Sequence, residues 1–238
     1  MTIGLVIFTV MLAGVLRGIT GFGGAMLMTP LLSVVLGGVP AIIIVLAIET
    51  AAALIMVPAI YGDVRLGRLI LLTAPACLTV PIGSALLTSL DPSSSRRLIG
   101  GAVVVFSLAL MSGIRYSRHP TPSLTAAVGA LSGVLLGATS IGAPPVILFL
   151  LSGPDPAKTT RAILTVFISI TSLVGVVATL HNAERSAPPA SWVCLLCVIY
   201  LGSIFVGMKL FHKLNDFGAR LIALTLMLIF GVITVVIG

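Results

Sequence analysis

The most constraining feature of this sequence is a glycine-rich break in an apolar run that occurs twice. The first copy, residues 16–30, reads LRGITGFGGAMLMTP, and a shift of 119 residues lays LLGATSIGAPP, residues 135–145, over its start. Identical residues then coincide at Gly18/Gly137, Thr20/Thr139 and Gly23/Gly142, and further along at Gly83/Gly202. Because the interruptions fall at equivalent places, we interpret the chain as an internal duplication with repeats at 1–118 and 119–238.

The composition predicts a membrane environment. Hydrophobic residues make up 58% of the chain and charged residues 8%, with a mean hydropathy of +1.27. Such a chain cannot cover its surface with polar groups in water, so we expect an all-α integral membrane protein that forms a single domain in the lipid bilayer. The net charge of +7 comes from Lys and Arg residues between the apolar runs. This pattern is typical of loops that set membrane orientation, and no nucleic-acid partner is expected.

Six apolar runs are long enough to span a bilayer, which takes about 20 helical residues. They cover residues 41–60, 69–87, 98–114, 157–180, 190–208 and 217–237. The segments beside the breaks, 2–16 with 26–36 and 123–136 with 145–151, are shorter. Two short helices around a break form either one discontinuous spanning helix or a re-entrant hairpin.

The distribution of basic residues favours the re-entrant hairpin. With two hairpins, one face has only Arg96, Arg97 and Arg185, and the other gathers Arg65, Arg68, Arg115, Arg118, Lys158, Arg161, Lys209, Lys213 and Arg220. Positive charge concentrates on the cytoplasmic side of membrane proteins, so both termini are expected on the outer face. Each repeat then has one re-entrant hairpin and three spanning helices, and the two repeats are inverted. Inverted repeats with paired breaks are typical of secondary transporters whose site lies between the breaks.

The candidate binding residues lie at the breaks. A helix that starts just after each break presents free N–H groups, and two facing starts would bind an anion. Close approach of a ligand to the backbone is expected at four glycines, and three hydroxyls add donors; these residues are Gly21, Gly23, Gly24, Gly142, Thr20, Thr139 and Ser140. The alternative is that the glycines only allow close packing of helices.

Arg17 and Glu49 are the charged residues that lie well inside apolar runs. An ionisable side chain in a membrane is costly and marks a functional site by default. Arg17 is expected at the first break, where its guanidinium would bind a substrate anion. Glu49 either pairs with Arg17 or takes up a proton that accompanies transport. Neither charge is duplicated, because Leu136 and Ile168 occupy the equivalent positions.

Other chemistry has little support in the sequence. The three histidines lie in expected loops or at helix ends. No metal site, cofactor or enzymatic activity is therefore expected. Two further functions stay open beside a transporter: an anion-selective channel and a non-transporting membrane subunit. Ser172 and its neighbours Thr165, Ser169 and Thr171 are weaker binding candidates, because such hydroxyls often bond to their own helix.

The motif GFGG at residues 21–24 followed by Pro30, with a degenerate copy GAPP at 142–145, resembles the TauE/SafE family. This is the sulfite exporter and 4-toluene sulfonate uptake permease group. The resemblance implies a secondary transporter of the bacterial inner membrane for sulfite, sulfoacetate or another organosulfonate, coupled to protons. It carries over to Gly21, Gly23, Gly24 and Pro30, and to Gly142 and Pro144 in the second copy. The expected partners are a small sulfur-containing anion, the bilayer and protons, and a homodimer is an open alternative.

Overall fold

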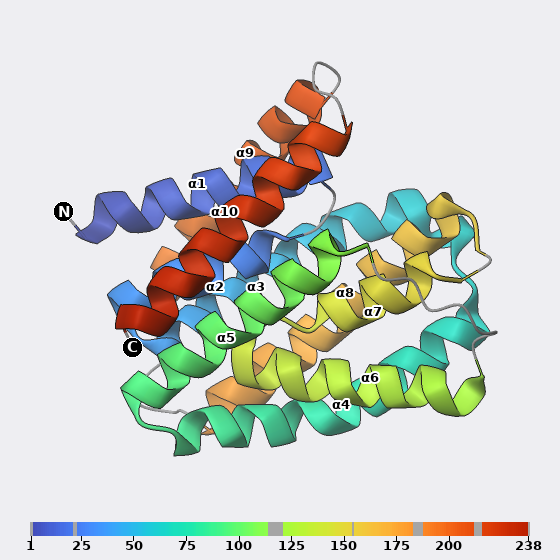
Figure 1. The fold of residues 1–238 in the computed structure, drawn as a ribbon, viewed down its shortest axis with the longest axis horizontal. Helices are drawn as coiled ribbons and strands as arrows, with labels where there is room; N and C mark the ends of the chain where they lie inside the picture. The colour runs from blue at the N-terminus through green and yellow to red at the C-terminus, as the bar shows by residue number, and fades with distance from the viewer. Residues whose placement is uncertain are drawn as a thin grey trace.

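The structure is a computed structural model that describes residues 2–20, 23–113, 121–153, 155–182, 188–211 and 216–237. Within these ranges the fold is all-helical, which confirms the expected class (Figure 1). The helices are α1 Thr2–Thr20, α2 Gly24–Leu36, α3 Gly38–Ile60, α4 Leu66–Ser89, α5 Pro92–Met111, α6 Pro122–Thr139, α7 Ala143–Leu151, α8 Ala157–Asn182, α9 Ala190–Phe211 and α10 Asp216–Ile237, with a 3-10 turn η1 at Tyr61–Asp63. A helix bonds its own backbone groups, which a segment in lipid requires.

The breaks are shorter than the sequence indicated. Helix α1 continues to Thr20 and α6 to Thr139, so both first arms are longer than expected and Arg17 lies in the last turn of α1 instead of at the break. The boundaries still repeat at one offset. The ends of α1 and α6, the starts of α2 and α7, and the starts of α3 and α8 are each 119 residues apart.

Close packing explains why glycines near the breaks stay helical. Helix α1 packs on α9, and α6 packs on α4. A Cβ added to Gly18 would lie 2.3 Å from the carbonyl oxygen of Ile204, and one added to Gly137 would lie 2.1 Å from that of Val80. Small residues allow such close approach between membrane helices. These two glycines are therefore fixed by helix packing.

The later helices repeat with a different offset. A Cβ on Gly83 of α4 would lie 2.1 Å from the oxygen of Val134, and one on Gly207 of α9 would lie 2.2 Å from that of Val15. Gly83 and Gly207, which are 124 residues apart, thus occupy equivalent positions. Gly202, the expected equivalent of Gly83, has no atom within 4 Å of such a Cβ. That pairing was wrong because extra residues lie between α8 and α9, whereas α3 and α4 are separated by a short turn.

Both ends of the second hairpin lie at the start of α4. Helix α6 runs parallel to α4, since Gly129 meets Leu72 and Gly137 meets Val80. Helix α7 turns back beside α6, as Figure 1 shows. After α7, Asp155 accepts hydrogen bonds from Arg65, at 2.6 Å, and from Arg68. The carboxylate of Asp155 is fully buried beside these arginines, although it stands in a loop.

The first hairpin opens toward the other end of the bundle. The junction of α2 and α3 at Gly38 packs against Leu87, in the last turn of α4, and against Ser95, in the first turn of α5. The equivalent helices α3 and α8 run antiparallel: Gly175 packs on Leu46, and Lys158 binds Asp63 at 3.0 Å at the opposite ends of these helices. Antiparallel equivalent helices are the geometry that inverted repeats require.

Helix α5 starts with a carboxylate cap. Asp91 is the N-cap, and its side chain accepts hydrogen bonds from the amides of Ser93 and Ser94 at 3.1 and 3.0 Å. Hydrogen bonds hold the pKa of Asp91 well below its usual range, and the bond from the Ser93 hydroxyl contributes most. The carboxylate of Asp91 is therefore ionised in the folded protein at neutral pH.

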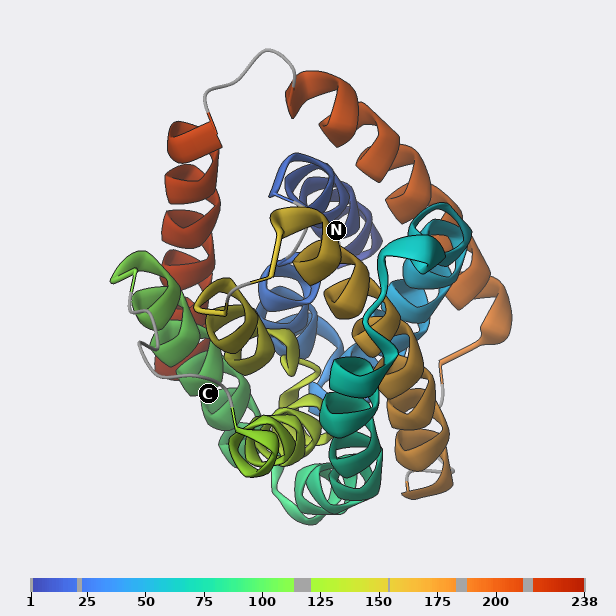
Figure 2. The ribbon, with the colours of Figure 1, turned by 90° about the vertical axis from the view of Figure 1, so that its right-hand side faces the viewer.

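Among the described residues, six helices have the length and apolar character of membrane spans, and they are α3, α4, α5, α6, α8 and α9. The number agrees with the expectation but the set does not. Helix α6 qualifies although it was expected as a short arm, and the described apolar part of α10, Leu221–Ile237, is shorter than the others. Viewed along the bundle, α2 and α3 lie inside, and α9 and α10 lie toward the outside (Figure 2).

Candidate functional site: a pocket between the two breaks

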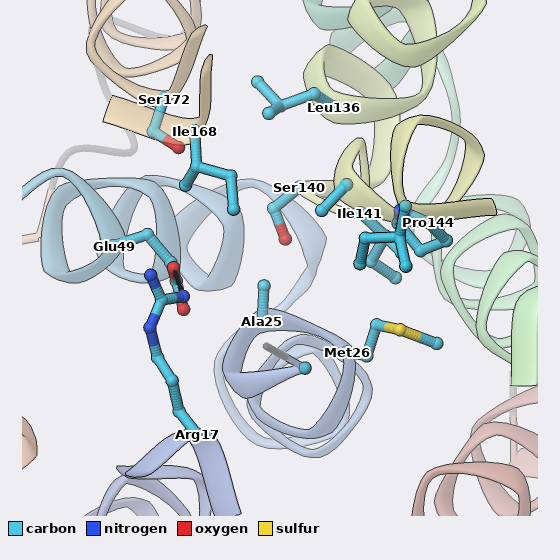
Figure 3. A pocket seen from close by; sticks show the side chains of 13 residues that line it. Arg17, Ala25, Met26, Glu49, Leu136, Ser140, Ile141, Pro144, Ile168 and Ser172 are labelled. Carbon is cyan, nitrogen blue, oxygen red and sulfur yellow. Dashed lines mark hydrogen bonds and ion pairs between the residues drawn. The ribbon is translucent and has the colours of Figure 1, made fainter. Parts of the chain in front are cut away.

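Both breaks line one pocket in the interior of the bundle (Figure 3). The first break contributes Gly23, Ala25 and Met26, and the second contributes Ser140, Ile141, Ala143 and Pro144. Other helices complete the wall with Arg17, Glu49, Leu136, Ile147, Ile168 and Ser172. The lining is mostly apolar, and the few polar groups converge on one side of it. This composition is typical of a site for a small molecule.

Arg17 and Glu49 form a buried ion pair at the edge of this pocket. Arg17 Nη1 donates to Glu49 Oε2, and the two residues are 5% and 3% exposed. Figure 3 shows the two head groups together, reached from α1 and α3. Arg17 Nε is buried and has no hydrogen-bond partner among the described residues. The guanidinium is therefore only partly satisfied, which is costly inside a protein unless a further acceptor binds it.

Tyr200 is a third member of this cluster that sequence reasoning missed. It lies in the middle of α9, is fully buried, and donates from its hydroxyl to Glu49 Oε1 at 2.8 Å. The hydroxyl also lies against the start of α2, because a Cβ on Gly24 would be 1.9 Å from it. The available signal was a phenol in the middle of an apolar run, since a buried Tyr hydroxyl usually has a hydrogen-bond partner.

The start of α2 provides free amides to the pocket. Gly23 is its N-cap, with a φ of 89° that a glycine adopts without strain, and no side chain caps this end. The amides of Gly24, Ala25 and Met26 therefore stay available at the positive end of the helix. A Cβ on Gly23 would also lie 2.3 Å from the methyl carbon of Met227 on α10. Gly23 is thus required by both its backbone conformation and its packing.

The start of α7 is different, so the two helix starts are not equivalent donors. Its first residues are Ala143, Pro144 and Pro145, and proline has no N–H group. Only the amide of Ala143 is left from the first three residues. The two helix starts therefore differ, because the second has lost most of its donors to proline.

A hydrogen bond joins the two hairpins beside the pocket. The hydroxyl oxygens of Thr29 in α2 and Ser140 after α6 are 2.5 Å apart. Ser140 adopts a left-handed backbone with a φ of 58°, which non-glycine residues rarely adopt. This conformation ends α6 and directs the side chain into the pocket, as Figure 3 shows.

Ser172 differs from the other hydroxyls of α8. Thr165, Ser169 and Thr171 each bond a carbonyl of their own helix, as expected. Ser172 has no hydrogen bond in the described part of the chain, although it is 2% exposed and lines the pocket. Its hydroxyl is therefore a free donor one turn beyond Ile168, the position equivalent to Glu49.

The predicted binding residues fall into three groups. Arg17, Gly23, Ser140 and Glu49 line the pocket. Three more lie behind it: Gly24 under Tyr200, Thr139 with its hydroxyl bonded to the Leu135 carbonyl and the Ile141 amide, and Gly142 with its carbonyl bonded by Ser132. The side chain of Thr20 and all of Gly21 lie outside the described residues. In the same described ranges, no three His, Cys, Asp or Glu side chains are grouped as a metal site would need.

The fold and the pocket define a class, a multi-pass membrane protein with a buried cation at an internal site between two broken hairpins. The model of the family described as sulfite exporter TauE/SafE matches residues 6–234, and the chain belongs to this family of membrane transporters. Comparison with curated proteins and with solved structures finds no match. Membership of the family therefore identifies the protein as a transporter. Its substrate is inferred from the chemistry of the pocket.

Proposed function

We propose that this protein is a secondary transporter that moves a small sulfur-containing anion, such as sulfite, sulfoacetate or another organosulfonate, across the bacterial inner membrane with protons. The pocket between the breaks is the substrate site, and both termini face outward. Arg17 is the observation that carries this proposal. A buried guanidinium with a free Nε beside a pocket is suited to an oxyanion, because its planar N–H groups match the oxygens of such an anion.

The other polar groups of the pocket suit the same ligand. Ser140 points inward, but its hydroxyl is bonded to Thr29 and to the Thr139 carbonyl. The hydroxyl of Ser172 has no partner among the described residues, and the start of α2 has free amides. Together they offer hydrogen bonds to several oxygens of one small anion. The apolar remainder of the wall accommodates a short organic group such as the methyl or methylene of a sulfonate.

The arrangement of the two halves supports alternating access. The equivalent helices α3 and α8 run in opposite directions, and the two hairpins open toward opposite ends of the bundle. Two inverted halves have interchangeable conformations, so rocking one against the other exposes a central site first to one side and then to the other.

The test is the thermal stability of the detergent-purified protein with sulfite, sulfoacetate, methanesulfonate, taurine, sulfate and uncharged dimethyl sulfone. A ligand at 100 times its dissociation constant adds about 2.7 kcal/mol to the free energy of unfolding. We expect a selective rise in unfolding temperature with a sulfur oxyanion and none with the sulfone. The rise should be lost in Arg17→Gln and kept in Arg97→Gln, a control at an exposed arginine near the start of α5. No shift with any anion would contradict the proposal.

A further inference from the structure

Glu49 already occupies the place of an anion in this pocket. One of its oxygens accepts from Arg17 and the other accepts from Tyr200. The carboxylate also lies at the start of α2, since a Cβ on Gly24 would be 2.8 Å from Glu49 Oε1. An arriving oxyanion would need the Arg17 cation and the start of α2. The carboxylate of Glu49 already occupies both.

We propose that Glu49 is a built-in counter-anion that a monovalent oxyanion replaces once Glu49 has taken up one proton, so that the pocket carries one monovalent anion together with one proton. This inference rests on the proposed function and specifies its substrate charge and its coupling. The organosulfonates with a single charge and hydrogen sulfite belong to this class. Sulfate and the doubly charged sulfoacetate do not.

Charge balance in a buried site carries the argument. With Glu49 ionised, its pair with Arg17 is neutral, and a further anion would leave one uncompensated negative charge. An uncompensated charge is strongly disfavoured away from water. When the carboxylate accepts a proton from the water on the entry side, a monovalent anion restores neutrality with Arg17. A dianion leaves a net charge even then.

The other ionisable groups of the described residues do not line the pocket. Among the described residues that line the pocket, Arg17 and Glu49 are the ionisable ones, and Tyr200 is the third such group in contact with them. The elements packed on α3 carry further charged or titratable groups only near helix ends and in turns. Those described are Arg65, Arg68, Arg96, Arg97, Lys158, Arg161, Lys209, Asp63 in η1 and the exposed His181 at the end of α8. The proton therefore enters on Glu49 and returns to water from Glu49 when the anion leaves on the other side.

The experiment is calorimetric titration of methanesulfonate into the purified protein between pH 5.5 and 8.5. In the wild type, the dissociation constant should rise with pH, by up to about tenfold for each pH unit, because one proton binds with each anion. In Glu49→Gln the dissociation constant should not change with pH. Asp91→Asn, which alters a carboxylate at the start of α5 far from the pocket, should keep the wild-type profile.

Proton uptake gives a second measurement that needs no variant. Titration of the wild type in buffers of different ionisation enthalpy should show one proton taken up per methanesulfonate, and sulfate should not compete. Methanesulfonate binding that does not vary with pH and takes up no proton would overturn this inference and the coupling to protons, while leaving intact the proposed site and its class of substrate. Equal binding of sulfate would overturn the restriction to one charge. Absence of binding of every sulfur anion at every pH would instead overturn the proposed function.

Discussion

Buried ion pairs are rarely retained for stability alone. Removing two charges from water costs several kcal/mol per ion, and the attraction between them repays this only when the remaining hydrogen-bonding groups are satisfied. Arg17 and Glu49 meet that condition incompletely, because Nε of Arg17 has no partner in the described structure. A pair that is left partly unsatisfied beside a pocket is better explained by ligand binding than by folding.

Tyr200 gives a prediction at the residue scale. Tyr200→Phe keeps the ring and removes the hydroxyl, which leaves one oxygen of the buried Glu49 without a donor. An unsatisfied buried group costs about 1–3 kcal/mol. We expect the unfolding temperature of the purified protein to fall accordingly.

Phe205→Leu is the matched control for that change. It alters an aromatic residue of the same helix that is 57% exposed on the outer surface of the bundle. Its unfolding temperature should stay close to that of the wild type. If Tyr200→Phe is no less stable than this control, Tyr200 does not hold Glu49 in place.

The sequence predicted the charged members of the site better than the neutral ones. Arg17 and Glu49 were evident because a charge inside an apolar run is rare. Tyr200 and Ser172 were harder to single out, since tyrosines and serines occur in membrane helices for many reasons. Only the fold shows that Tyr200 reaches Glu49 from a segment 151 residues away and that Ser172 has no bond to its own helix.

At the scale of helices, glycine packing is the clearest prediction. Gly137→Ala places a Cβ 2.1 Å from the Val80 carbonyl oxygen and 2.7 Å from the Ser84 amide, so α6 and α4 have to separate. Overpacking of this kind typically costs about 1–3 kcal/mol. The free energy of unfolding in mixed micelles should fall by an amount in that range.

Gly202→Ala provides the opposite case in a helix interior. Its Cβ would meet nothing within 4 Å. Alanine favours a helix over glycine by about 1 kcal/mol, so this variant should be as stable as the wild type or slightly more stable. Equal destabilisation by the two alanines would contradict the close contact of α6 with α4.

The sequence predicted where the two breaks lie, but it did not predict how far the helices before them extend. The repeated motif located both breaks, because glycine, proline and hydroxyl residues interrupt an apolar run. It did not show that residues 17–20 and 137–139 continue the helices. Those residues are helical because α9 and α4 pack against Gly18 and Gly137, and contacts between distant segments are not visible in local composition.

At the scale of the whole molecule, membership of the transporter family and the all-helical fold were predictable. The apolar composition required a membrane, and a hydrocarbon environment leaves helices as the spanning structure for such a chain. The inverted relation of residues 1–118 and 119–238 remains a prediction, and their boundary lies outside the described residues. Charge counting placed Arg65, Arg68 and Lys158 on one side, and these three do lie together through Asp155 and Asp63.

The ion pairs at that end could not be derived from the sequence. Asp155 stands in a polar stretch between two helices, where a carboxylate is usually solvated or caps a helix. The return of α7 beside α6 brings it to the start of α4, where two arginines cover it. Asp155 meets Arg65 and Arg68 because of the direction in which the second hairpin returns, and the sequence does not show that direction.

The central claim is that an anion crosses the membrane through the pocket between the breaks by a carrier mechanism. Exchange of labelled methanesulfonate in proteoliposomes tests this most directly. We predict that uptake saturates, rises when unlabelled methanesulfonate is present inside, and is lost in the double variant Arg17→Gln with Glu49→Gln, which keeps the pocket neutral. Uptake that grows in proportion to concentration, gains nothing from internal anion and persists in the double variant would contradict the claim and indicate a channel.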